Sequence, residues 1–165
     1  MRLKHEFSPV YNSDSTVLIL GSFPSVKSRE QSFYYGHPQN RFWRVLARIC
    51  SRDIPITTDE KKSLCLSNGI ALWDVIESCE IEGSSDSSIR SAKVNDLSVI
   101  LDNCDIKQIF VNGGTAYKLF VKYQQKATGR TAVKLPSTSP ANASWSIERL
   151  YNEWRIIEDY IRNGR

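Results

Sequence analysis

The sequence lacks long hydrophobic segments. No uninterrupted apolar run in its 165 residues approaches the roughly 18–20 residues that a membrane-crossing helix needs. The N-terminal stretch MRLKHEFSPVYN also lacks the apolar core of a signal peptide. These two absences favour a soluble cytoplasmic protein. The length is sufficient for one domain with a substantial core, so we expect a single domain over residues 1–165.

Cysteine and histidine are scarce and scattered. The cysteines are Cys50, Cys65, Cys79 and Cys104; none belongs to a CxxC pair, and no histidine lies near them in sequence. Zinc and iron–sulfur sites usually show closely spaced ligands, so this pattern favours buried free thiols and no metal. The glycine patterns GxxxxGK[ST] and GxGxxG are also absent, and no nucleotide cofactor is expected.

The charge of the chain is slightly unbalanced. A formal net charge of +4 leans towards anionic partners, nucleic acid among them, without requiring one. Hydrophobic residues make up 41% and charged residues 24% of the chain, the proportions of an ordinary globular protein.

Apolar runs alternate with helical patterns along the chain. Short β-branched and apolar runs predict strands of a buried parallel sheet at residues 16–21, 69–74, 109–113 and 131–135. Apolar residues at spacings of three and four predict helices after Asn40, over 57–68, over 96–104, from Thr115, and over 147–161. This alternation is typical of an α/β fold with a doubly wound sheet. The serine-rich stretch 82–91 is predicted to be an exposed loop.

Small and polar residues follow each predicted strand. The segments are GSFPS (21–25), WDV (73–75), NGGT (112–115) and PSTSPANAS (136–144). Ligands of open parallel sheets bind beyond the carboxyl ends of the strands, so these segments are candidates for a site. GSFPS is equally compatible with a tight turn that places Phe23 in the core. PSTSPANAS is compatible with a plain surface loop or with phosphate contacts through its hydroxyl groups.

Asn112 ends a predicted buried strand and its amide needs hydrogen-bond partners. It can satisfy the NGGT turn, or it can face a ligand. An amide presents an acceptor beside a donor. That pair matches the edge of uracil or hypoxanthine, whereas cytosine and adenine present the reverse pattern.

The run YYGHPQNRFW (34–43) places four aromatic rings just before and at the start of a predicted helix. Arg41, Phe42 and Trp43 are expected to be helix and core residues, and His37 a structural hydrogen-bonding residue. Together, GSFPS, YYGHPQNRFW and LPSTSPANASW resemble the uracil-DNA glycosylase superfamily. They are most similar to its hypoxanthine-DNA (deoxyinosine) glycosylase branch, and HPQNRFW is shared in form with mismatch-specific uracil glycosylases.

This resemblance implies a three-layer α/β/α sandwich around a four-stranded parallel sheet. It also implies a repair enzyme that flips a deaminated base out of DNA and hydrolyses its N-glycosidic bond without metal or cofactor. Phe23 stands where the superfamily usually has a water-activating Asp or Asn, and Ser137 where a second motif often begins with His or Asn. The hypoxanthine branch resembles this pattern, and the resemblance implies the Asn of the His-Pro-x-Asn motif, here Asn40, as the residue that holds the water. Tyr35 matches the ring that stacks on the base, and the small Ser25 leaves room for a purine.

The implied site residues are as follows: catalytic, Asn40 and Asn112; base-binding, Gly21, Ser22, Phe23, Ser25, Tyr35 and Asn112; DNA-binding, Ser137, Thr138, Ser139, Pro140, Ala141 and Asn142. The implied partner is DNA that contains deaminated bases, hypoxanthine above uracil, bound by a monomer. A G:U mismatch-specific uracil glycosylase and a catalytically silent damaged-DNA-binding module are the alternatives.

Overall fold

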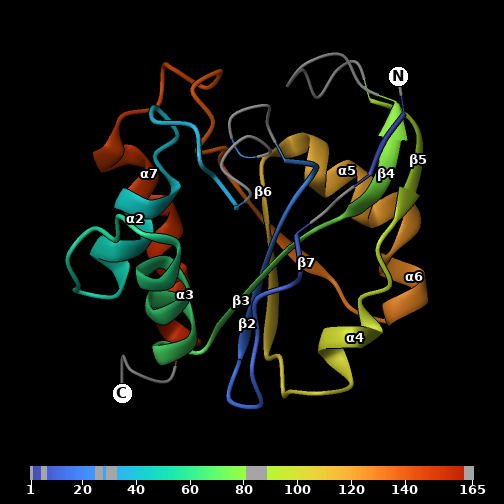
Figure 1. Cartoon of the computed structure of the whole chain (residues 1–165), viewed down its shortest axis with the longest axis horizontal. Helices are drawn as coiled ribbons and strands as arrows, with labels where there is room; N and C mark the ends of the chain where they lie inside the picture. The colour runs from blue at the N-terminus through green and yellow to red at the C-terminus, as the bar shows by residue number, and fades with distance from the viewer. Residues whose placement is uncertain (1, 5–6, 25–27, 29–32, 81–88, 162–165) are drawn as a thin grey trace.

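The structure is a computed structural model that describes residues 2–4, 7–24, 28, 33–80 and 89–161 (Figure 1). Ser25 and most of the predicted loop at 82–91 lie outside the described residues. No helix of the described residues is long and apolar enough to cross a membrane.

The predicted parallel sheet is present. Its strands are β2 (Val17–Gly21), β3 (Ile70–Asp74), β6 (Gln108–Asn112) and β7 (Ala132–Leu135), in the order β3-β2-β6-β7. All neighbouring pairs are parallel, and every residue of β2 and β3 is buried. The register sets Gly21 opposite Asp74, and Asn112 opposite Leu135. The last residues of these strands are therefore level with one another at one edge of the sheet.

Helices cover both faces of this sheet, which confirms the three-layer α/β/α prediction. On one side lie α2 (Phe42–Ile49), α3 (Thr58–Ser67) and α7 (Ile147–Trp154), the last continued by the 3₁₀ turn η2 (Arg155–Asp159) (Figure 1). On the other side lie α5 (Gly114–Tyr123) and α6 (Gln125–Thr128). The helix predicted over 96–104 is reduced to α4 (Ser98–Leu101). The apolar spacing predicted at 147–161 is retained through η2, where Ile157 is fully buried.

A second sheet was not predicted from the sequence. β1 (Arg2–Lys4), β4 (Ile76–Glu80) and β5 (Arg90–Val94) form an antiparallel sheet in the order β1-β4-β5. The loop prediction for 82–91 is therefore wrong at Arg90 and Ser91, which open β5. The short, polar RSAKV segment becomes a strand only because β4 supplies its hydrogen-bonding partner, and a local pattern does not reveal such pairing.

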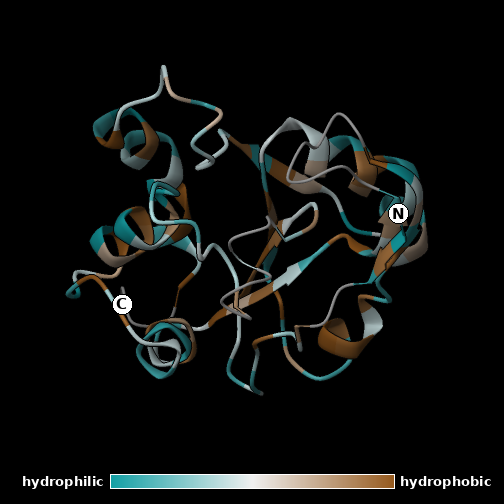
Figure 2. Cartoon of the chain, turned by 45° about the horizontal axis from the view of Figure 1, so that its top comes forward, coloured by the Kyte–Doolittle hydropathy of each residue, from teal (hydrophilic) through white to brown (hydrophobic). Residues whose placement is uncertain are grey.

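Hydrophobic residues concentrate along the central strands and the inner faces of the helices (Figure 2). An aromatic cluster ties the 34–43 segment to α7. The ring of Phe42 packs against Tyr35, Trp43 and Trp154, with centroid distances of 3.9, 4.8 and 5.8 Å. Trp154 Nε1 also donates to the carbonyl oxygen of Pro136 at 2.8 Å. Phe42 and Trp43 are core residues, as predicted, and they hold the preceding segment against the body of the protein.

The start of α3 allows a stability test. Thr57 Oγ1 accepts from the backbone N–H of Glu60 at 3.1 Å, and Glu60 Oε1 accepts from the backbone N–H of Thr57 at 3.0 Å. Loss of this capping box in Thr57→Ala should lower the free energy of unfolding by about 1 kcal/mol, measured by urea denaturation. The exposed neighbour Thr58 is the matched control, and Thr58→Ala should change stability by less than about half that amount. Equal effects of the two substitutions would contradict the capping role.

Candidate active site

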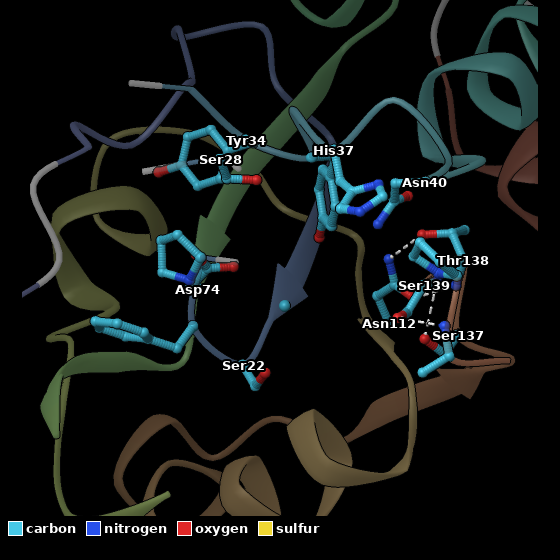
Figure 3. Close-up of a pocket in the computed structure, with 16 residues that line it drawn as sticks. Ser22, Ser28, Tyr34, His37, Asn40, Asp74, Asn112, Ser137, Thr138 and Ser139 are labelled. Carbon is cyan, nitrogen blue, oxygen red and sulfur yellow. Dashed lines mark hydrogen bonds between the residues drawn. The ribbon is translucent and has the colours of Figure 1, made fainter. Parts of the chain in front are cut away.

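A pocket of about 330 Å³ opens at the carboxyl ends of the parallel strands (Figure 3). Its volume lies within the ~300–1,000 Å³ usual for small-molecule sites. It brings together predicted residues from the segments GSFPS, YYGHPQNRFW, NGGT and PSTSPANAS, namely Gly21, Ser22, Phe23, Tyr35, Asn40, Asn112, Ser137, Thr138, Ser139, Pro140 and Ala141. Asn142 does not line it. The pocket also contains residues not predicted for the site, namely Pro24, Ser28, Tyr34, His37 and Asp74.

Asn40 lies at the entry to α2, and its side chain is partly engaged. Its Oδ1 accepts from the backbone N–H of Phe42 at 2.9 Å. A backbone N–H can only donate, so this bond determines which end of the amide carries the oxygen. An amide oxygen has two lone pairs, and one remains for a further donor such as water. Asn40 is thus held in one orientation while it keeps an acceptor position.

Asn112 is held by a single partner residue. Its Oδ1 accepts from the backbone N–H of Thr138 at 3.1 Å, and its Nδ2 donates to Thr138 Oγ1 at 3.0 Å. The NGGT turn is therefore not what satisfies this amide. Gly113 makes the approach possible, because its φ is +96° and a Cβ there would lie 3.2 Å from the Cβ of Ser137. One N–H and one oxygen lone pair of Asn112 remain for a ligand.

The hydroxyl groups after β7 accept backbone hydrogen bonds. Ser137 Oγ accepts from the N–H of Ser139, and Ser139 Oγ accepts from the N–H of Ala141, both at 3.1 Å. Each hydroxyl keeps its own hydrogen to donate to an anionic oxygen. Thr138 has no exposed surface, so its hydroxyl serves Asn112 rather than an external group. Asn142 closes the loop by donating from Nδ2 to the carbonyl oxygen of Ser137 at 3.0 Å.

Tyr35 supplies a flat wall. Its ring stacks on that of Phe42 at a centroid distance of 3.9 Å and an interplanar angle of 19°. Its φ of +55° is uncommon for a residue other than glycine and carries a conformational cost of about 1 kcal/mol. The aromatic packing beneath the ring retains this backbone conformation. Phe23, which is 8% exposed, lines the pocket and also belongs to the core.

Asp74 lies in the candidate segment WDV, but the sequence reasoning did not assign it as a site residue. It ends β3, its exposed fraction is 3%, and it lies across the pocket from the Asn112 cluster (Figure 3). A Cβ at Gly21 would lie 2.6 Å from Asp74 Oδ1 and 3.0 Å from the hydroxyl oxygen of Tyr35. Glycine at this position therefore allows the carboxylate and the phenol to converge. An acidic residue at the end of a buried apolar strand was the signal in the sequence that could have identified it.

Buried amides hold the backbone around Asp74. Asn95 Nδ2 donates to the carbonyl oxygen of Asp74 at 2.8 Å, and Gln124 Nε2 donates to the carbonyl oxygen of Asn95 at 2.9 Å. The N–H of Val75 donates to the carbonyl oxygen of Gly21 at 2.8 Å. The turn from β3 into β4 is thus fixed from several elements, and the Asp74 side chain starts from a rigid position.

His37 lies beside Asn40 in the pocket wall (Figure 3). Its Nδ1 accepts from the backbone N–H of Gln39 at 3.0 Å, as expected for a structural hydrogen-bonding residue. The pocket therefore combines fixed amides, hydroxyl donors and one carboxylate. Among the residues that the structure describes, no group of three or more His, Cys, Asp or Glu side chains is arranged to hold a metal ion.

Comparisons with known proteins agree with one another. The model of the protein family described as the Uracil DNA glycosylase superfamily matches residues 8–160 of this chain. A Methanosarcina acetivorans protein named hypoxanthine DNA glycosylase is 34% identical over 159 residues, covering 94% of this chain and 98% of that protein. A Methanosarcina barkeri protein of the same name is 36% identical over 112 residues, covering 67% of this chain and 71% of that protein. A solution NMR structure from M. acetivorans, provisionally named as a uracil DNA glycosylase, matches with a TM-score of 0.81 and 32% identity, covering 95% of this chain and 96% of that one.

Burial of the pocket residue Tyr34 is expected to lower the free energy of unfolding at alkaline pH. Burial, and then the charges of Asp74 and Tyr35, raise the pKa of Tyr34 well above its usual value of 10.0. Folding therefore keeps this phenol neutral at a pH where the unfolded chain ionises it. Its contribution to stability is complete below pH 10 and falls above it, by up to about 1.4 kcal/mol per pH unit.

Urea unfolding between about pH 8 and 11 would measure this dependence. The decline above pH 10 should be less steep in Tyr34→Phe than in the wild type. Tyr123 is 39% exposed, and Tyr123→Phe should leave the slope unchanged. Equal slopes in Tyr34→Phe and the wild type would show that burial of this phenol has no such effect.

Proposed function

Because this chain belongs to the uracil DNA glycosylase superfamily, and is therefore a hydrolase of N-glycosyl bonds in DNA, we propose that it excises deaminated bases, with hypoxanthine as the preferred one. The observation that carries the proposal is Asp74, a buried carboxylate that faces the pocket from the side opposite to Asn112. The hypoxanthine DNA glycosylase name of relatives at 34% and 36% identity supports the choice of base.

Asp74 supplies the base selectivity in this proposal. An ionised carboxylate is an acceptor only. Hypoxanthine presents N1–H and uracil presents N3–H on the edge used for pairing, whereas adenine and cytosine present a nitrogen lone pair there. Adenine or cytosine would set a lone pair against a desolvated carboxylate, which costs several kcal/mol relative to a hydrogen bond. The carboxylate therefore accepts deaminated bases and rejects the bases from which they arise.

Tyr35 is proposed to stack on the extruded base. Phe42 supports the far face of its ring at 3.9 Å, so the near face is presented to the pocket without the ring having to be ordered on binding. Extrusion of the base costs a few kcal/mol, least for weakly paired deaminated bases. Stacking on an aromatic ring returns about 1–3 kcal/mol.

The chemical step places charge at two positions. As the bond between base nitrogen and C1′ breaks, its electron pair goes to the base, and positive charge develops on the sugar. The oxygen of a water molecule then bonds to C1′ and loses a proton, and the departed base takes up one proton, so that a neutral base and an abasic sugar result. Asn40 is proposed to hold this water through the remaining lone pair of Oδ1. Asn112 is proposed to direct its remaining N–H towards the negative charge. Fixed neutral groups suffice because the transition state is already cation-like.

The loop after β7 is proposed to bind the DNA strand. Ser137 and Ser139 donate their hydroxyl hydrogens to phosphates next to the extruded nucleotide. Pro140 and Ala141, with Asn142 beside them, occupy the space that the base leaves. Because the Asn142 amide is used within the loop, its contribution is steric. Excision of uracil opposite guanine remains a second candidate, since uracil N3–H fits the same carboxylate.

Single-turnover excision from oligonucleotides that contain inosine or uracil tests the proposal. Asn40→Ala should lower the rate by about 100-fold or more, the scale of losing one positioning or stabilising group. Binding of the wild type to damaged DNA without release of any base would instead identify a silent binding module.

A matched variant separates chemistry from folding in this test. Asn40 also accepts a hydrogen bond at the start of α2, so alanine should remove about 1 kcal/mol of stability. Asn40→Ser keeps a short acceptor for that role but does not reach the water, and it should be as inactive as alanine. Near-full activity in folded Asn40→Ser would disprove the assignment.

A modified substrate tests Asp74. In N1-methylhypoxanthine a methyl group replaces the donor, so the wild type should excise it at least about tenfold more slowly than hypoxanthine. Asp74→Ala lacks the acceptor and has room for the methyl group, so the ratio of the two rates should approach one. Asp74→Asn, which keeps an oxygen acceptor, should give an intermediate ratio. An unchanged ratio in folded Asp74→Ala would mean that Asp74 does not face this edge of the base.

A further inference from the structure

Arg41 follows Asn40 directly, and its side chain turns into the loop after β7. The guanidinium donates from Nη2 to the carbonyl oxygens of Ser139 at 2.9 Å and Asn142 at 3.0 Å, and from Nη1 to that of Trp145. The backbone N–H of Arg41 donates to the carbonyl oxygen of Thr138 at 3.1 Å. One residue thus binds carbonyl groups along the whole of 138–145. The sequence pattern predicted only a helix or core residue at this position.

The use of this guanidinium is unusual for a protein that acts on DNA. In the part of the chain that the structure describes, no carboxylate pairs with Arg41. Carbonyl oxygens carry partial negative charge, and a loop that turned them towards phosphates would repel the DNA. Arg41 draws them inward through charge-assisted hydrogen bonds. The outer side of the loop is then left to the hydroxyl donors of Ser137 and Ser139 and to Ala141, which is exposed.

The same bonds connect the loop to both amides of the site. Arg41 directly follows Asn40 in the chain. Its backbone N–H also bonds to Thr138, and Thr138 is the residue that holds Asn112 by two hydrogen bonds. A shift of the loop therefore moves the groups that hold Asn40 and Asn112. The planar fork of arginine suits several fixed acceptors, whereas the ammonium of lysine is a point charge on a flexible stem.

We propose that Arg41 is a positioning residue: it holds the 137–145 loop in its DNA-binding shape and aligns it with Asn40, and it does not itself contact a phosphate. This inference rests on the proposed function for its kinetic consequence. Its structural consequence, a loop ordered before DNA arrives, is independent of that function and is measured separately.

The test compares Arg41→Lys and Arg41→Met with the same changes at Arg44, an exposed residue of α2. Arg41→Lys keeps the charge but not the fork, and Arg41→Met keeps the length without the charge. Three quantities are measured for each folded variant: the single-turnover excision rate on inosine DNA at saturating protein, the salt dependence of DNA binding, and hydrogen exchange of the 137–145 segment in the free protein.

Both Arg41 variants should lower the excision rate by about tenfold or more and speed hydrogen exchange in 137–145, while the Arg44 variants should change neither. The slope of log binding constant against log salt should stay that of the wild type in Arg41→Met. A slope smaller by about 0.9 would reveal a direct phosphate contact and overturn the proposal.

Two further outcomes would also overturn it. Wild-type rate and exchange in Arg41→Lys would show that charge alone matters. A slower rate with unchanged exchange would show that Arg41 acts on the substrate and not on the loop. If the wild type released no base from any oligonucleotide, the proposed function would fail, and the exchange measurement would still decide whether Arg41 orders the loop.

Discussion

The site depends on the close approach of three chain segments over Gly21. The last residue of β2 lies beside the last residue of β3, and the absence of a Cβ leaves space for the Asp74 carboxylate and the Tyr35 hydroxyl together. Backbone bonds from Val75 and Ile76 to the carbonyl oxygens of Gly21 and Ser22, at 2.8 and 3.1 Å, continue the contact beyond the sheet. These contacts begin at the ends of β2 and β3, in which every residue is buried, so the floor of the pocket continues directly from the core.

Polar groups around the pocket follow one pattern. Asn40, Asn112, Ser137 and Ser139 each make one or two hydrogen bonds within the protein and keep a further donor or acceptor position. The internal hydrogen bond fixes the direction in which the unused donor or acceptor position points. Such preorganisation avoids the reorganisation that water would need as charge develops, and this is the usual source of electrostatic catalysis. The hydrogen bonds that hold these side chains in the fold therefore also orient them for their proposed chemical roles.

The distribution of charge explains how a mildly basic chain can carry a buried carboxylate in the pocket that we propose to bind a base of DNA. Asp74 lies deep in the pocket, 3% exposed, where only a base would reach it. The loop after β7 lies at the rim, where phosphates would approach, and its carbonyl oxygens are bound by Arg41. Negative charge is thereby kept from the rim, and the acceptor that the proposed base selection requires lies deep in the pocket.

The sequence by itself determined the parallel strands, most of the helices and the segments that surround the pocket, because these follow from local apolar patterns and from the rule that sites form at the carboxyl ends of parallel strands. Motifs such as HPQNRFW also indicated the family before any geometry was known. Only the tertiary structure decided that Asp74 faces the pocket, that Thr138 is buried against Asn112, and that β5 pairs with β4. The side-chain contacts of Arg41 span 98 to 104 residues of sequence. Such contacts depend on where the sheet and its helices bring distant residues together, and no local pattern contains that information.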